Sequence, residues 1–155
     1  MKTIRLLLLV LPIGTLLHAQ LPDTDIFLCD MKKDTEGWHF SKPVNLTRRK
    51  GYDNQPEFTA DGRSFYFVSI NKDTTQSDIY RCDFTRMRVE RVTRTPESEY
   101  SPRRTPDSSW ISVVRVDADS GQRFYVIPIS NPRVSTSVSG SDSIGYYTWV
   151  SDSLI

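Results

Sequence analysis

The sequence is poor in the residues from which most catalytic and metal sites are built. Histidine occurs only at His18 and His39, and cysteine only at Cys29 and Cys82. No set of these residues has the spacing of a zinc site. The chain also contains neither a G-x-S-x-G nucleophile elbow nor a phosphate-binding or dinucleotide-binding glycine motif. The sequence therefore predicts neither an enzyme nor a site for a metal or cofactor.

Long apolar runs are also absent, except at the N-terminus. There Lys2 and Arg5 begin an apolar stretch that continues to Leu17, and Ala19 offers a small residue before Gln20. The run is about a dozen residues long, whereas a membrane-spanning helix needs roughly 20. Residues 1–19 are therefore predicted to be a signal peptide cut after Ala19, rather than a membrane anchor. The processed chain is expected to be periplasmic or secreted, with no membrane span.

An excess of charge of either sign is missing. The chain has 20 basic and 19 acidic residues, and removing Lys2 and Arg5 with the leader leaves 18 basic residues and a net charge of −1. Acidic residues interrupt the basic clusters, which fall where loops and strand edges are expected, at 48–50, 86–94 and 103–104. These clusters are interpreted as solvated faces or guarded edges, and no nucleic-acid partner is predicted.

No segment after the leader has the apolar period of a helix. Instead, residues 54–93 read as four short strands, at 55–59, 64–70, 78–83 and 89–93, with a hairpin turn at Asp61-Gly62. The pattern begins again 46 residues later, where Pro102 and Asp107 repeat Pro56 and Asp61. Four short strands per roughly 45 residues predict an all-β fold of β-propeller blades, each with four antiparallel strands. A β-sandwich is the alternative.

The chain divides accordingly into the leader and a region of repeats over residues 20–155. The repeats comprise a half blade at 25–47, a blade at 54–93, a blade at 101–138 and the start of another at 147–155. In the half blade, strands at 25–30 and 38–47 flank a polar turn at 31–37. In the second blade, the serine-rich stretch 130–143 gives no clear fourth strand. About two and a half blades cannot close a ring, because propellers need roughly four to eight, so we expect a fragment of a longer propeller.

Three aspartates, Asp61, Asp107 and Asp152, recur at the same place in successive repeats. Recurrence at one period indicates that the turn needs them, so they are predicted to cap turns rather than to form a catalytic or calcium-binding set. Gly62 supplies the positive φ of the first turn. The second turn has Ser108 in place of glycine, which is expected to strain or reshape it.

The two cysteines occur in matching contexts, DIFLCD at 25–30 and DIYRCD at 78–83. Equivalent positions in successive blades are a whole repeat apart, which usually exceeds the Cα separation of about 7 Å that a disulfide tolerates. Cys29 and Cys82 are therefore predicted to be unpaired and to lie on matching strands.

The repeated motifs resemble the TolB-type β-propeller family, which is related to the WD-type propellers. The residues that carry the resemblance are Leu46-Thr47, Pro56-Glu57-Phe58, the Thr59–Gly62 turn and Asp78-Ile79-Tyr80. They are followed a second time by Val92-Thr93, Ser101-Pro102 and Thr105-Pro106-Asp107. The resemblance covers about residues 25–155, nearly all of the chain after the leader.

This resemblance implies an exported, non-catalytic binding or scaffolding module that recognises a protein or cell-envelope ligand. The alternative is the N-terminal propeller fragment of a larger hydrolase, such as a prolyl oligopeptidase-like peptidase. The candidate contact residues lie in two loops where blades begin: Arg48, Arg49, Asp53, Asn54, Tyr100, Arg103 and Arg104.

Overall fold

The computed structural model describes residues 22–70, 75–151, 153 and 155. These residues form twelve β-strands and no α-helix, and none of them belongs to a helix that could cross a membrane. The predicted signal peptide and Asp152 lie outside the described residues.

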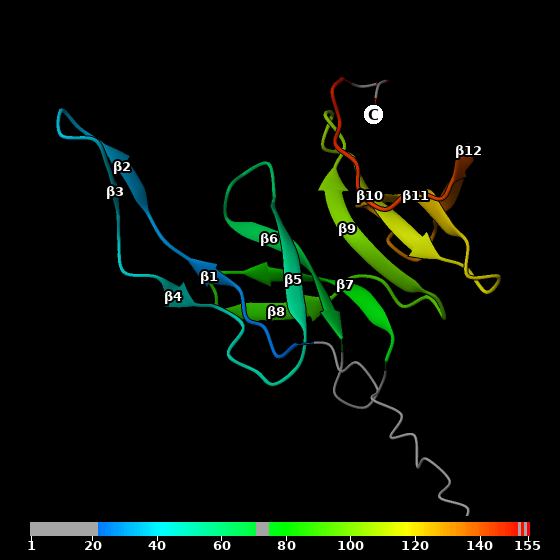
Figure 1. The fold of residues 1–155 in the computed structure, drawn as a ribbon, viewed down its shortest axis with the longest axis horizontal. Helices are drawn as coiled ribbons and strands as arrows, with labels where there is room; N and C mark the ends of the chain where they lie inside the picture. The colour runs from blue at the N-terminus through cyan, green and yellow to red at the C-terminus, as the bar shows by residue number, and fades with distance from the viewer. Residues whose placement is uncertain (1–21, 71–74, 152, 154) are drawn as a thin grey trace, which may run out of the picture.

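Two four-stranded antiparallel sheets make up most of the structure (Figure 1). Blade one comprises β5 (Asp53–Phe58), β6 (Ser64–Ile70), β7 (Ser77–Asp83) and β8 (Arg88–Arg91), paired in chain order. Blade two comprises β9 (Ser98–Arg104), β10 (Trp110–Val116), β11 (Gln122–Pro128) and β12 (Thr136–Asp142), again paired in chain order. The predicted all-β fold of four-stranded blades is confirmed, and the described residues do not close a ring.

The serine-rich end of blade two does form a fourth strand, although the amino acids there offer little indication of one. β12 pairs antiparallel with β11, and the register shifts between Arg123 and Tyr125. All its residues except Ser141 are exposed. A strand at a solvated sheet edge pairs through its backbone and requires no apolar side chains. A run of serines can therefore form this strand.

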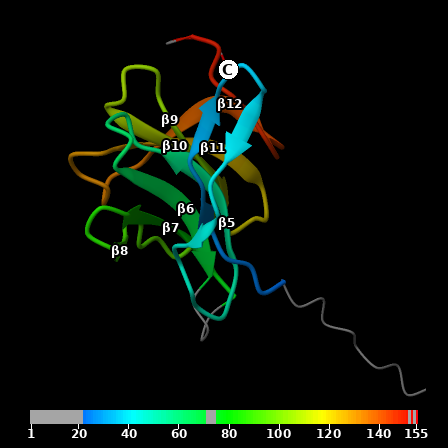
Figure 2. The same cartoon turned by 90° about the vertical axis from the view of Figure 1, so that its left-hand side faces the viewer.

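Residues 25–47 form two short strand pairs rather than two longer strands around a turn. β1 (Phe27–Leu28) pairs with β4 (Val44–Asn45), and β2 (Met31–Lys33) pairs with β3 (Trp38–Phe40). The prediction that 31–37 is all turn was therefore wrong for its first three residues. Asp34 explains the tighter turn, since its Oδ1 atom accepts a hydrogen bond from the Glu36 amide at 2.8 Å. The hairpin extends away from the blades in Figure 1, and it lies in front of them in Figure 2, which views the molecule from that side.

The core depends on β6, whose seven residues are all buried. Successive side chains of a strand point to opposite faces. Phe65 and Phe67 pack with Ile26 and Leu46 of the 25–47 segment. Tyr66 and Val68 face the other way and pack against blade two, in a cluster completed by Ile79, Ile111, Val113 and Ile127. One strand therefore holds the segment before it and the blade after it together.

Residues after β12 cover the face of blade two that points away from blade one. The ring of Tyr147 meets Phe124 edge-on with 4.7 Å between centroids, and Trp149 lies 5.8 Å from the same ring. The indole Nε1 of Trp149 donates a hydrogen bond to the Ser112 hydroxyl at 2.9 Å. Tyr147 and Trp149 thus pack where the next blade would be expected.

Both cysteines carry free thiols, as predicted. Cys82 is buried in β7, and burial raises the pKa of its thiol. Cys29 is exposed and lies between β1 and β2 instead of inside a strand. The expectation of matching strands was therefore wrong, because the strand predicted at 25–30 ends at Leu28.

The two blade turns share one geometry. Gly62 has a φ of 64° and Ser108 a φ of 59°, so the second turn keeps the first one's shape with a residue that is strained there. Asp61 Oδ1 accepts hydrogen bonds from the Thr59 hydroxyl and the Arg63 amide, at 2.6 and 3.1 Å. Asp107 Oδ1 accepts the matching bonds from Thr105 and Ser109, at 2.5 and 3.1 Å. Each aspartate caps its turn.

Replacing Gly62 with alanine should lower the free energy of unfolding by about 1 kcal/mol. A Cβ at this position would meet no atom within 4 Å, so the cost is the left-handed backbone alone. Urea denaturation measures it. Gly145→Ala is the matched control, since Gly145 also has open space but no positive φ. Equal stability losses in the two variants would contradict this explanation.

The turn carboxylates should make the fold sensitive to acid. Hydrogen bonds from the threonine hydroxyls, followed by those from the backbone amides, hold the pKa values of Asp61 and Asp107 below their ordinary 3.8. Carboxylates with lowered pKa values stabilise the fold above about pH 4, and that stability is lost as the pH falls through the lowered values. Urea midpoints between about pH 2 and pH 5 should fall less steeply for Asp61→Asn/Asp107→Asn than for the parent chain. An unchanged slope would show that these carboxylates do not contribute.

Candidate functional site

The predicted contact residues fall on the inner strands β5 and β9 and on the loop before β5. The structure places them in three different surroundings: a buried ion pair, an exposed set of salt bridges between blades, and an aromatic hollow. These surroundings decide which of the predicted residues can contact a ligand.

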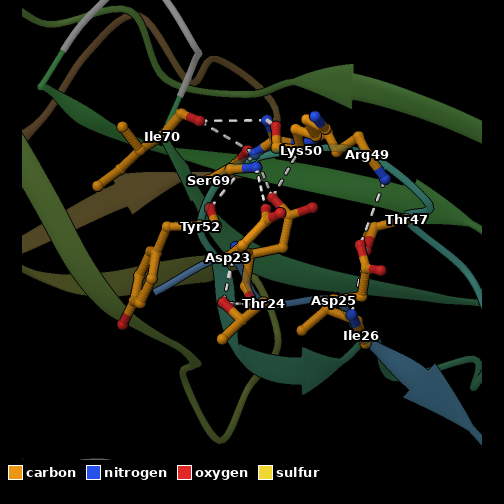
Figure 3. Close-up of polar contacts among 12 residues, drawn as sticks. Asp23, Thr24, Asp25, Ile26, Thr47, Arg49, Lys50, Tyr52, Ser69 and Ile70 are labelled. Carbon is orange, nitrogen blue, oxygen red and sulfur yellow. Dashed lines mark hydrogen bonds and ion pairs between the residues drawn. The ribbon is translucent and has the colours of Figure 1, made fainter. Parts of the chain in front are cut away.

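Arg49 and Asp53 belong to a polar network at the start of β5. Figure 3 shows this network around Arg49, Ser69 and Ile70. The Asp53 side chain is fully buried, and its Oδ1 atom accepts a hydrogen bond from Arg49 Nε at 3.0 Å. The same guanidinium donates to the carbonyl of Ile70, at 3.2 Å from Nη1 and 3.1 Å from Nη2, and to the hydroxyl of Ser69. These contacts tie the loop to the end of β6, so the donors of Arg49 are largely used inside the protein.

Blade two contains an equivalent network, in which the arginine and the hydroxyl-bearing residue have exchanged positions. Glu99 is fully buried and accepts hydrogen bonds from Arg115 Nη2 at 2.7 Å and from the Thr95 hydroxyl at 3.1 Å. The guanidinium of Arg115 also lies 4.1 Å from the centre of the Tyr125 ring. Both networks join the loop before an inner strand to the strand beside it.

The two networks occupy equivalent positions, 46 residues apart. Thr95, Glu99 and Arg115 correspond to Arg49, Asp53 and Ser69, so the arginine moves from the loop to the strand while the carboxylate stays in place. Sequence reasoning missed Glu99 and Arg115. The recurrence of an acidic residue at 53 and 99 was the one signal that could have found them.

Arg103 and Arg104 face the neighbouring blade. Arg103 Nη1 lies 3.0 Å from the Glu57 carboxylate, and Arg104 Nε lies 3.9 Å from it. Arg104 also donates to the Ser108 hydroxyl at 2.8 Å. Arg48 is exposed and donates from Nε to the carbonyl of Asn45 at 3.0 Å. Arg103 is exposed as well, so it and Arg48 stay predicted contacts on the surface.

A backbone irregularity directs one residue of each inner strand towards the next blade. Gln55 and Ser101 have φ angles of 56° and 52°, and both lie where the pairing register shifts. The Ser101 amide donates to Gln55 Oε1 at 2.7 Å, and the Tyr147 hydroxyl donates to the Ser101 carbonyl at 2.9 Å. The residues of each bond are 46 apart, so equivalent positions of successive repeats are joined, although the donor and acceptor groups differ.

Beside these contacts lies a cavity of about 250 Å³, which we call the inner-strand hollow. Among the described residues, three tyrosines, two glutamines and no charged side chain line it, together with small residues and one valine: Tyr52, Gln55, Tyr100, Ser101, Val114, Gln122, Gly145 and Tyr146. Tyr146 is 85% exposed. Of the predicted contacts, Tyr100 lines the hollow and Asn54 adjoins it, since its amide donates to the Tyr52 hydroxyl at 3.0 Å.

The lining of the hollow is suited to binding. Tyrosine rings and carboxamides offer flat apolar surface with hydrogen-bond donors and acceptors, a combination common in protein recognition. Among the described residues, no group of three or more histidine, cysteine or acidic side chains could hold a metal ion. Sequence reasoning missed Gln55, Gln122 and Tyr146, although Asn54, Tyr100 and Tyr146 follow one another at the 46-residue period.

No protein-family model and no curated protein matches the sequence. Solved structures do match the fold. A TolB structure from Agrobacterium tumefaciens superposes with a TM-score of 0.55 and 18% identity, covering 73% of this chain and 42% of that one. TolB from Acinetobacter baumannii superposes with a TM-score of 0.53 and 20% identity, covering 74% of this chain and 30% of that one. The fold is that of a TolB-like β-propeller. The chain spans less than half the length of these two structures.

In this TolB-like propeller, the two sheets are successive blades and the 46-residue period is the blade repeat. The bulges at Gln55 and Ser101 then lie on the innermost strand of each blade. The buried carboxylates Asp53 and Glu99 begin those strands. The inner-strand hollow is consequently formed by side chains of two adjoining blades and of the segment after β12.

Replacing Arg115 with methionine should lower the free energy of unfolding by about 3 kcal/mol, because it leaves the buried carboxylate of Glu99 without its cation. Arg103→Met is the control. It removes a guanidinium whose side chain is 44% exposed, and it should cost about 1 kcal/mol or less. Urea denaturation of both variants provides the comparison. Similar losses would mean that the buried pair does not anchor the loop.

Proposed function

We propose that this protein is an exported, non-catalytic binding or scaffolding module of the cell envelope, and that its inner-strand hollow contacts a protein ligand. The observation that carries the proposal is the uncharged, tyrosine-rich lining of the hollow, in which Tyr146 is almost fully exposed. A large aromatic side chain left in water is an unused contact surface, and tyrosine is enriched where proteins meet.

The surroundings of the hollow support the same proposal. Its backbone is held by the Gln55–Ser101 and Ser101–Tyr147 hydrogen bonds, so the lining side chains start from fixed positions. A preformed surface loses little conformational freedom when it binds. Export is supported by the apolar leader that follows Lys2 and Arg5.

A photo-crosslinking amino acid placed at Tyr146 tests the proposal. The chain is expressed with its own leader in cells that export it, and irradiation should yield an adduct with a specific protein in the exported fraction. The expected adduct follows from the exposure of Tyr146 at the mouth of the hollow. Mass spectrometry identifies the partner.

Val89 is the matched control for this experiment. It is 48% exposed on β8, the strand furthest from the inner strand in blade one. The same probe at Val89 should give no adduct of that size. Equal crosslinking at both positions would contradict a role for the hollow, and retention of the chain inside the cell would contradict export.

A further inference from the structure

A second surface lies on the outer side of the blades, where β8 of blade one meets the β11–β12 loop of blade two. A cavity of about 540 Å³ opens here, lined by Arg91, Val92, Arg94 and Thr95 of blade one and its exit and by Asn131, Pro132 and Arg133 of the β11–β12 loop. A smaller cavity of about 210 Å³ shares Arg91, Val92 and Pro132 with it and adds Tyr66, Arg81, Glu90, Ile111 and Ile129. We call the two together the outer groove.

The arginines of the outer groove differ in whether a carboxylate pairs with them. Arg91 is anchored, since its Nη2 atom lies 2.8 Å from the Asp78 carboxylate and its Nε atom donates to the Thr93 carbonyl at 2.9 Å. Arg94 and Arg133 are exposed and make no ion pair or side-chain hydrogen bond with the residues that the structure describes. Burial raises the pKa of Asp78, and the charges of Arg91 and Arg94 oppose that rise, so Arg94 interacts at longer range with a carboxylate that is already paired with Arg91. The larger cavity therefore carries positive charge for which the described part of the chain provides no direct partner.

Several arginines have carboxylate partners that Arg94 and Arg133 lack among the described residues. In the smaller cavity Arg81 lies 3.7 Å from the Glu90 carboxylate, and outside the groove Arg103 lies 3.0 Å from that of Glu57 and Arg123 contacts three aspartates. Arg94 and Arg133 come from different blades and converge on one cavity without such a partner. Like charges at one cavity repel one another, and a negatively charged ligand would relieve that repulsion.

We propose that the outer groove binds an acidic peptide segment that carries an apolar side chain. Guanidinium groups pair with carboxylates through two parallel hydrogen bonds, and the Asn131 amide can bond the peptide backbone. Ile129 is 38% exposed and, with Pro132, offers apolar surface beside the charges. A ligand with charge alone would leave this surface unused, which favours a peptide over an inorganic anion.

A displayed library of random heptapeptides, selected on the purified chain, tests the proposal, because a random library requires no choice of partner in advance. Selection should enrich sequences with at least two acidic residues and one large apolar residue. Counter-selection against Arg94→Glu/Arg133→Glu should leave them in the pool, because the variant should no longer capture them, and should remove peptides that bind elsewhere on the chain. A selection that enriches no such sequence would overturn the proposal.

The affinity of the selected peptide, measured by fluorescence anisotropy, then locates the site. Arg94→Glu/Arg133→Glu should weaken it by about tenfold or more, because two attractions become repulsions. Arg63→Glu/Arg86→Glu changes the net charge equally at exposed positions outside the groove, and it should leave the affinity within about twofold. Equal losses in the two variants would show attraction to overall charge and would reject the site.

A last comparison separates a peptide site from a simple anion site. Ile129→Ser should weaken the selected peptide severalfold and should not alter binding of inorganic phosphate. Vesicles with anionic headgroups should not compete with the peptide at physiological salt. Phosphate or vesicles that bind through Arg94 and Arg133, with no effect of Ile129→Ser on the peptide, would overturn the proposal in favour of an anion site.

Discussion

The burial of β6 on both faces is the constraint on which the rest of this structure depends. A strand with one wet face could hold a single neighbour, but Phe65 and Phe67 pack against the 25–47 segment while Tyr66 and Val68 pack against blade two. In blade two, Val113 faces back towards blade one, whereas Ser112 bonds Trp149 of the following segment. Each blade is thus stabilised by its neighbours, as expected for a repeat architecture.

Buried ion pairs attach the loops before β5 and β9 to these packed strands. The Arg49–Asp53 and Arg115–Glu99 pairs both join a loop to the neighbouring strand. The cation comes from the loop in blade one and from the strand in blade two. What both blades retain is a carboxylate at the start of the inner strand. A fixed inner strand in turn gives the bulges at Gln55 and Ser101 their direction, and the inner-strand hollow follows from them.

Local patterns were enough to predict the elements whose cause is local. The Asp61-Gly62 turn needs only a capping carboxylate and a residue tolerant of positive φ, and β6 is a run of strand-forming residues. Prediction was weaker where backbone pairing decided the outcome. Met31–Lys33 read as a polar turn, and the serine-rich stretch 130–143 gave no clear fourth strand, yet strands form at both places, because edge pairing does not require apolar side chains.

The residues of the candidate site also fall into two groups, those that the sequence pattern indicated and those that only tertiary packing brings together. Tyr100 and Asn54 were within reach of the sequence because they start a repeated unit, and the 46-residue period alone determined the all-β blade architecture and the turn aspartates. Which side chains meet was decided only by tertiary structure. Gln55 and Ser101 touch because positive φ angles redirect them, and Arg94 and Arg133 meet because two blades stack. Local sequence specifies conformation, whereas contacts between repeats depend on how the repeats pack.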